Sequence, residues 1–193
     1  MSAAVPPRPR SELFCLAGLV LTAFLAHCQQ PEKARSLAPF VPSPQVVVDR
    51  MLEAAELKPG DILYDLGSGD GRVVITAAQR FRAKAVGVEI SDTLVRQTRE
   101  KIRQSGLESR VQIVHGHLLE VDLSPADVVT LYLLTSSNEQ LRPNLERFLK
   151  PGSRVVSHDF QIRGWEPERI ETAFVHNRQH TIYVYKMPPK KKK

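Results

Sequence analysis

The sequence predicts an α/β protein with a mostly parallel sheet and helices on both faces of that sheet. Apolar runs of strand length alternate with stretches of helical period, a pattern typical of βαβ units and parallel pairing. Glycines close the first apolar run, and the last two runs have no helix between them. These last runs, over 170–175 and 181–185, are expected to form an antiparallel hairpin at the edge of the sheet.

The first part of the domain predicts two helices and two strands. Residues 45–57 have apolar side chains at helical spacing and stop at a proline–glycine pair, which indicates a helix with an abrupt end. Residues 62–66 are a short apolar run before glycines and indicate a buried strand. Residues 71–81 return to the helical period, and residues 85–90 predict the next strand.

The second part continues this alternation. Ser91 and Asp92 are expected to cap a helix that runs to Gln104, because such side chains accept hydrogen bonds from the free N–H groups of a first helical turn. The remaining expected elements are strands over 111–114, 128–134 and 155–157, with a helix over 137–149 before the last of them.

Most of the excess positive charge lies at the two ends of the chain. The 193 residues have a formal net charge of +6, yet residues 38–185 contain 18 basic and 19 acidic residues. A near-neutral body offers little attraction to a phosphate backbone, so nucleic acid is not expected as a partner. The run Lys190–Lys193 is expected to be a flexible solubilising end or to contact anionic lipid or an acidic partner.

A glycine-rich loop, DLGSGDG over 65–71, follows the first strand and opens a helix. Ligands of an open parallel sheet bind at the carboxyl ends of its strands, where glycines let the backbone approach the ligand. The third glycine comes one residue earlier than in the dinucleotide fingerprint. Asp65 and Asp70 also place negative charge where a pyrophosphate would lie. The loop therefore favours a nucleoside ligand that has a positive centre and no phosphate.

Glu89 ends the strand that follows this loop. An acidic side chain at that place accepts hydrogen bonds from a ribose diol. Ribose without phosphate points to S-adenosylmethionine as the cofactor. A common tight turn and a solvated carboxylate are the alternatives, but the sequence of strand, glycine loop, helix, strand and terminal glutamate is much more specific than either.

These motifs resemble those of the seven-stranded class I S-adenosylmethionine-dependent methyltransferases, over about residues 40–186. The resemblance implies a Rossmann-like sheet of order 3-2-1-4-5-7-6 with strand 7 antiparallel. It implies that Asp65, Gly67 and Gly69 line the methionine part of the cofactor and that Glu89 holds the ribose. The full set of candidate cofactor-binding residues is Asp65, Gly67, Ser68, Gly69, Glu89, Ile90, His117 and Leu118.

His117 departs from the pattern of that family. It follows the third strand, where the family commonly has an acidic residue that contacts the adenine amine. A neutral imidazole, or the backbone of Leu118, would supply this contact instead.

A narrower resemblance lies in the segments 41–44 (VPSP), 154–157 (RVVS) and 165–167 (WEP), together with the glycine loop. These are similar to segments of the small protein-lysine methyltransferases of the ATP synthase c subunit and the adenine nucleotide translocase, and of their bacterial relatives. The resemblance implies methyl transfer to a lysine amine of a protein, including a membrane-embedded one. A small-molecule N- or O-methyltransferase is the alternative, and a tethered cofactor-binding protein without catalysis is a third possibility.

The candidate catalytic residues are Tyr132, His158 and Asp159. A lysine acceptor must lose a proton first, because its free pKa is about 10.4. Tyr132 lies near the end of the fourth strand, where it could orient an amine or simply pack. His158 and Asp159 follow the fifth strand, and strand alternation predicts that at most one of them points into the site. His180 has no metal-ligand partner at a suitable spacing, and no metal is expected.

The amino end has the pattern of an export signal or membrane anchor. Residues 13–26 carry no charge and follow two arginines, although a helix buried in the domain is the alternative. Both cysteines, Cys15 and Cys28, lie in this region, so the rest of the chain has no thiol for a disulfide or a metal site. Residues 25–28 resemble a lipoprotein box.

The chain is therefore expected to have three parts. These are a signal-like or membrane-anchor segment with its linker over 1–37, a methyltransferase domain over 38–187 and a basic tail over 188–193. Because the cofactor is made in the cytoplasm, we expect membrane association with the domain on the cytoplasmic side. An exported protein or a lipoprotein is the alternative.

Overall fold

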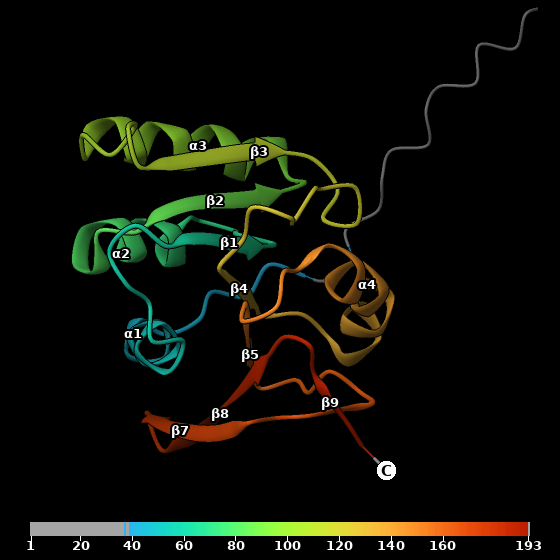
Figure 1. The fold of residues 1–193 in the computed structure, drawn as a ribbon. Coiled ribbons are helices and arrows are strands. Elements are labelled where there is room, and N and C mark those ends of the chain that lie inside the picture. Colours follow the sequence, from blue (N-terminus) through green and yellow to red (C-terminus); the bar gives the residue numbers. More distant parts are fainter. Residues whose placement is uncertain (1–36, 38, 193) are drawn as a thin grey trace, which may run out of the picture. The chain divides into compact units, whose positions relative to one another are not determined.

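Seven strands form the central sheet: β1 (Ile62–Leu66), β2 (Lys84–Glu89), β3 (Val111–His115), β4 (Val128–Leu131), β5 (Arg154–His158), β7 (Arg169–Val175) and β8 (Arg178–Lys186) (Figure 1). The computed structural model describes residue 37 and residues 39–192. The strand order is β3-β2-β1-β4-β5-β8-β7. Strand β8 pairs antiparallel with β5 and β7, and the other neighbouring pairs are parallel. Once the two-residue strand β6 (Trp165–Glu166) is left out of the count, this is the predicted order, and the predicted fold is confirmed.

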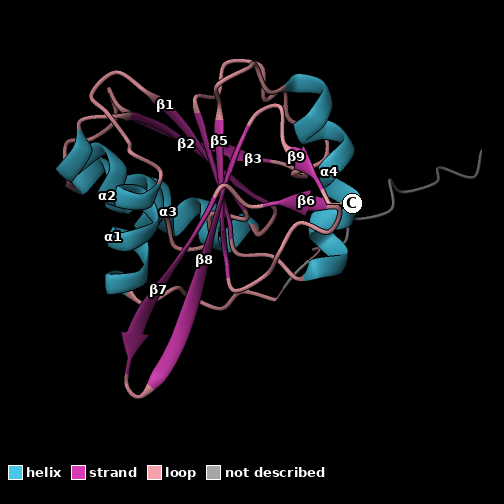
Figure 2. Cartoon of the chain, turned by 60° about the horizontal axis from the view of Figure 1, so that its bottom comes forward, coloured by secondary structure: helices cyan, strands magenta, loops and turns pink. Residues whose placement is uncertain are grey.

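Four helices flank this sheet in the described part of the chain: α1 (Gln45–Ala54), α2 (Arg72–Phe81), α3 (Asp92–Gln104) and α4 (Thr135–Phe148). Figure 2 shows α1, α2 and α3 on one side of the strands and α4 on the other, as predicted. Ser91 caps α3, because its hydroxyl accepts a hydrogen bond from the backbone N–H of Leu94 at 3.4 Å.

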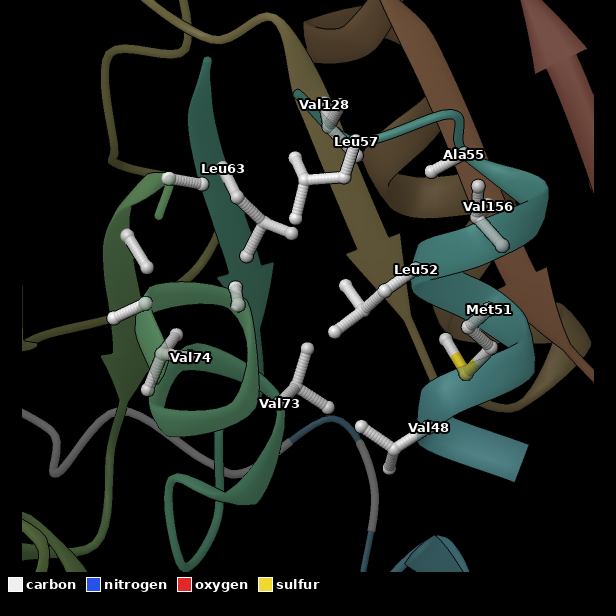
Figure 3. Packing of buried hydrophobic residues seen from close by; sticks show 14 of the residues in the cluster. Val48, Met51, Leu52, Ala55, Leu57, Leu63, Val73, Val74, Val128 and Val156 are labelled. Atoms are coloured by element: carbon white, nitrogen blue, oxygen red, sulfur yellow. The ribbon is translucent and has the colours of Figure 1, made fainter. Parts of the chain in front are cut away.

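The larger apolar core lies between the sheet and the helices α1, α2 and α3 (Figure 3). Met51 and Leu52 of α1 point toward Val73 of α2 and toward Leu63 and Val156 of the sheet, and all five side chains are buried. Full burial of one such side chain stabilises the fold by about 1.5–3 kcal/mol. Packing on this face therefore fixes α1, and with it the segment that precedes α1.

Strand β4 ends at Leu131, three residues before the predicted end. Its neighbour β1 pairs with it only as far as Leu66, after which the chain turns into the glycine loop. Residues 132–134 then have no partner strand on that side and leave the sheet. As a result, Tyr132 directly follows the strand at the edge where the glycine loop also lies.

The prediction of a membrane-associated chain, anchored with its domain on the cytoplasmic side, is corrected by the structure. Among the residues that the structure describes, no helix is long and apolar enough to cross a membrane. The apolar stretch over 13–26, on which the prediction rests, lies outside the described residues, and so does the lipoprotein-like segment 25–28.

Part of the basic tail pairs with the domain. Lys190–Lys191 form strand β9, which pairs antiparallel with β6. Lys191 also forms an ion pair with Glu146, which accepts a hydrogen bond from the indole of Trp165 at 2.8 Å. The domain boundaries at residues 37 and 187 remain predictions.

Candidate active site

A cavity of about 350 Å³ lies at the carboxyl ends of β1, β2, β3 and β4. Its walls come from the loops that follow these strands and from Leu37 and residues 39–43, which precede α1. Every residue predicted to bind the cofactor lines this cavity, and so does Tyr132, whereas His158 and Asp159 do not. The set at the cavity is Asp65, Gly67, Ser68, Gly69, Glu89, Ile90, His117, Leu118 and Tyr132.

The glycine loop forms the floor of this cavity. The backbone N–H groups of Gly67 and Ser68 both donate to the carbonyl of Val88 at 2.9 Å, which holds the loop against β2. Gly69 has a φ of +55°. A Cβ atom at this position would lie 2.4 Å from the ring of Phe40, so only glycine leaves the loop open beneath that ring.

Glu89 is a rigidly held carboxylate in the wall of the cavity. One of its oxygens accepts the backbone N–H of Gly69 and the other accepts that of Ser91, both at 2.8 Å. The side chain is buried. An ionised carboxylate has about four acceptor positions, so each oxygen can accept a further hydrogen bond from a ligand.

Asp65 is a second buried carboxyl group beside the loop. It accepts a hydrogen bond from the hydroxyl of Thr130 at 2.7 Å. Burial raises its pKa to about 7, and the negative charges of Glu89 and Asp70 act in the same direction. A positive ligand in the cavity would favour the charged form of this group.

An ion pair between Asp70 and Arg72 fixes the segment before α1 at the rim of the cavity. Arg72 Nη2 donates to Asp70 Oδ2 at 2.7 Å, and hydrogen bonds from Arg72 lower the pKa of Asp70. Arg72 Nη1 also donates to the backbone oxygen of Ser43 at 2.6 Å. Arg72 thus partly offsets the charge of Asp70, which was expected to act on the ligand.

Tyr132 and His158 form a stacked pair at the wall of the cavity. Their ring centroids lie 3.9 Å apart, and an angle of 27° separates the ring planes. Tyr132 lines the cavity, while His158 is fully buried behind it. Burial lowers the pKa of His158 to about 4, so its imidazole is neutral at pH 7.

The strand alternation expected for His158 and Asp159 does not continue to Asp159, and neither side chain lines the cavity. Asp159 has a φ of +59°, a left-handed conformation that breaks the alternation of the strand. Its Oδ2 consequently lies 3.4 Å from His158 Nε2 and 3.3 Å from His180 Nδ1. Both predicted side chains therefore belong to one cluster.

His180 has partners that its spacing in the sequence did not indicate. Its Nδ1 lies 2.8 Å from His158 Nε2, because β8 pairs antiparallel with β5. His158, Asp159 and His180 each offer one atom that could bind a metal, a ring nitrogen or a carboxylate oxygen. These three atoms lie within 4.8 Å of one another, a spacing that could hold a metal ion. They already bond to one another, and Asp159 also accepts a hydrogen bond from Arg178 at 2.9 Å.

Several residues that line the cavity were not among the predicted site residues, and three of them make specific contacts there. Phe40 covers the glycine loop, Arg72 holds the rim, and Ser43 places its hydroxyl 2.9 Å from His158 Nδ1. The segment 41–44 was noted for its resemblance to lysine methyltransferases, which is the signal that could have identified Ser43. Nothing in the local sequence indicates that Phe40 would reach the loop.

The sheet order, the glycine loop after β1 and the buried glutamate at the end of β2 together define a class I S-adenosylmethionine-dependent methyltransferase. The family model described as the ANTKMT methyltransferase domain matches residues 65–169. The chain belongs to this family. The predictions of a methyltransferase and of its cofactor are thereby confirmed.

Several known proteins are similar to this chain. A protein-lysine N-methyltransferase of Saccharolobus islandicus (strain REY15A) is 53% identical over 148 residues, which cover 76% of this chain and 92% of the relative. The human lysine N-methyltransferase of the ATP synthase c subunit is 29% identical over 140 residues, and the match spans 72% of this chain and 59% of the relative. The crystal structure of an RNA methyltransferase from Salinibacter ruber in complex with S-adenosyl-L-homocysteine has 48% identity and a TM-score of 0.72, and the match covers 77% of this chain and 94% of that one.

The cavity fits this cofactor in two respects that the structure itself supplies. The hydroxyl of Ser68 is buried at the cavity and has no hydrogen-bond partner, so it is free to bond to a ligand. Glu89 retains acceptor positions for the hydroxyls of a ribose. A nucleoside with polar groups at both places would satisfy them.

Proposed function

We propose that this enzyme transfers the methyl group of S-adenosylmethionine to the ε-amine of a lysine in a protein. The observation that carries the proposal is the 53% identity to a relative named as a protein-lysine N-methyltransferase, over 92% of the length of that relative. The catalytic unit in this proposal is the domain over 38–187.

The chain's own residues would hold the cofactor along the cavity. Glu89 accepts hydrogen bonds from the ribose hydroxyls, and Ile90 packs beside it. Gly67 and Gly69 let the methionine part approach the backbone, with Ser68 bonding to its polar groups. Asp65 places a carboxyl group near its positive charge. The cofactor supplies an electrophilic methyl group when it is bound.

His117 and Leu118 would contact the adenine. They belong to the loop after β3, and both line the cavity, as Ile90 does. The ring of His117 already accepts the backbone N–H of Leu119 at its Nδ1, at 3.3 Å, so its Nε2 is the atom that remains for a ligand.

Tyr132 and Ser43 would form the wall that the acceptor meets. Both line the cavity and carry a hydroxyl, so they can orient an amine by hydrogen bonding without an ionised partner that would stabilise its charged form. His158 and Asp159 lie behind this wall and would act through Tyr132 and Ser43 as positioning residues.

RNA is the competing acceptor, because one similar structure is that of an RNA methyltransferase. The nearly equal numbers of basic and acidic residues over 38–185 favour protein over RNA. Small molecules are the remaining class of acceptor.

Labelling with a radioactive methyl donor would separate these acceptors. The enzyme is incubated with labelled S-adenosylmethionine and a cell extract, and the products are treated with protease or ribonuclease. We expect label in material that protease digests and ribonuclease does not. Glu89→Ala should abolish this labelling, whereas Glu108→Ala, at an exposed position of matched chemistry, should preserve it. Label confined to RNA or to small metabolites would contradict the proposal.

A further inference from the structure

A continuous row of hydrogen-bonding side chains leads from the cavity to the surface. Ser43 Oγ, at the cavity wall, lies 2.9 Å from His158 Nδ1, and His158 Nε2 lies 2.8 Å from His180 Nδ1. Asp159 Oδ2 lies 3.3 Å from the same nitrogen of His180 and pairs with Arg178, whose side chain is 64% exposed. We call Ser43, His158, His180 and Asp159 the relay row.

The relay row can hold its protons in two arrangements. In the first, the hydroxyl of Ser43 donates to His158 Nδ1, and His158 Nε2–H donates to His180 Nδ1. In the second, His180 Nδ1–H donates to His158 Nε2, and His158 Nδ1–H donates to Ser43. Both satisfy the bonds from Ser43 to His158 and from His158 to His180, because a neutral imidazole carries one donor and one acceptor nitrogen. Only the second also places a proton on His180 Nδ1 that can be shared with Asp159. Conversion of the first arrangement into the second moves one proton away from the cavity.

We propose that the relay row carries the proton of the acceptor ammonium from the cavity to solvent before methyl transfer, an inference that rests on the proposed lysine acceptor. The ammonium gives its proton to Ser43 Oγ as the serine hydroxyl proton passes to His158 Nδ1. The Nε2 proton of His158 passes to His180 Nδ1, and the proton that neutral His180 carried on its Nε2 leaves to solvent, so that the relay row ends in the second arrangement with both imidazoles neutral. The amine keeps its electron pair, which then forms the new N–C bond, while the pair of the broken S–C bond stays on sulfur.

The groups around His158 favour a ring that passes a proton on over a ring that stays positively charged in an ion pair. The titratable and charged groups that face it are Asp159, His180, Arg178 and Tyr132. Burial and the charge of Arg178 oppose a lasting positive charge on its ring, while the carboxylate of Asp159 favours a transient one. His158 can therefore pass a proton on without retaining it.

His180→Asn is the first test, because an asparagine amide can replace the hydrogen bond at Nδ1 but cannot pass a proton through a ring. We expect kcat/KM at pH 7 to fall about 100-fold. This loss in kcat/KM should become smaller as the pH rises, by up to tenfold per pH unit. The reason is that the variant must bind lysine that is already neutral, and the neutral fraction of lysine increases as the pH approaches its free pKa of about 10.4. The wild-type profile should level off at a lower pH.

Substitutions of Ser43 give a second test, in which a conservative variant should restore the rate. Ser43→Ala should show the same pH-dependent loss, and Ser43→Thr, which keeps a hydroxyl, should recover most of the rate. His176→Asn is the matched histidine control, since His176 is exposed in the turn between β7 and β8. Calorimetric binding of S-adenosylhomocysteine should be unchanged in each variant, and each variant should still unfold cooperatively.

Nuclear magnetic resonance of the free protein gives a readout that needs no activity. The ring nitrogens of His158 should report a neutral imidazole exchanging between two tautomers, and His180→Asn should remove this exchange. A single fixed tautomer in the wild type would overturn the relay. The relay would also be overturned if kcat/KM of the variants were lower than that of the wild type by the same factor at every pH. If the wild type methylates no lysine at all, the proposed function itself fails, which is a separate outcome.

Discussion

The ring of Tyr132 lies against the buried ring of His158, with centroids 3.9 Å apart, so a residue of the cavity wall is held by the β5–β8 layer behind it. This stack restricts the tyrosine to one orientation and points to a positioning role for its hydroxyl. Tyr132→Phe keeps the ring and removes only the hydroxyl. We expect kcat to fall about five- to tenfold, as for the loss of one hydrogen bond, with unchanged affinity for S-adenosylhomocysteine. Steady-state kinetics with a protein acceptor would measure this, and an unchanged kcat would reduce Tyr132 to a packing residue.

Glu89→Gln should weaken cofactor binding. In the wild type, the two carboxylate oxygens of Glu89 accept the N–H groups of Gly69 and Ser91. The glutamine amide has only one oxygen, so it can accept only one of these two hydrogen bonds. Hydrogen bonds to a charged group contribute about 1.5–3 kcal/mol, so the Kd for S-adenosylhomocysteine should rise about 10- to 100-fold. Isothermal titration calorimetry checks this. Glu108→Gln serves as the exposed control, and equal affinities of the two variants would count against the role of Glu89.

Asp65→Asn should change how stability depends on pH. Folding raises the pKa of Asp65 from its ordinary 3.8 to about 7, so between these values the unfolded chain loses its proton while the folded chain keeps it. The wild type is therefore destabilised progressively as pH rises through this window, by about 1.4 kcal/mol per pH unit at most, and the cost is constant above it. Denaturant unfolding at pH 4 to 8 should show the variant gaining stability relative to the wild type up to about pH 7. A pH-independent difference would contradict the raised pKa.

Gly71→Ala should destabilise the fold more than Gly106→Ala. Both glycines have positive φ, +78° and +64°, and an alanine in that region costs about 1–2 kcal/mol. A Cβ at Gly71 would also lie 2.2 Å from Thr98 Cγ2, which is fully buried, whereas nothing lies within 4 Å of one at Gly106. Overpacking adds about 1–3 kcal/mol. Urea denaturation gives the free energy of unfolding of each variant, and the difference between the two variants measures the cost of the contact with Thr98. Equal losses of stability in the two variants would show that Thr98 moves aside.

The sheet and the cofactor cavity could be predicted because their signals are local. The glycine loop, the strand before it and Glu89 lie within one βαβ unit, and parallel strands bring their carboxyl ends to the same edge. The same reasoning gave the wrong end for β4, because the end of this strand depends on how far β1 pairs with it.

The cluster behind the acceptor wall could not be predicted in this way. His180 meets His158 through the register of β8 against β5, which pairs His158 with Ile182, and sequence spacing carries no information on that register. The positive φ of Asp159 is likewise set by tertiary contacts, including the bond from the backbone N–H of Thr181 to its carboxylate at 2.9 Å.

Mass spectrometry of a protein methylated by the wild-type enzyme tests lysine methylation most directly. The acceptor band from the labelling experiment is digested, and the modified position is located by fragmentation. The expected result is an added methyl group on the ε-nitrogen of a lysine, absent when that lysine is replaced by arginine or when Glu89→Ala enzyme is used. Methylation of another side chain, or methyl transfer only to ribonucleotides, would contradict the proposed function.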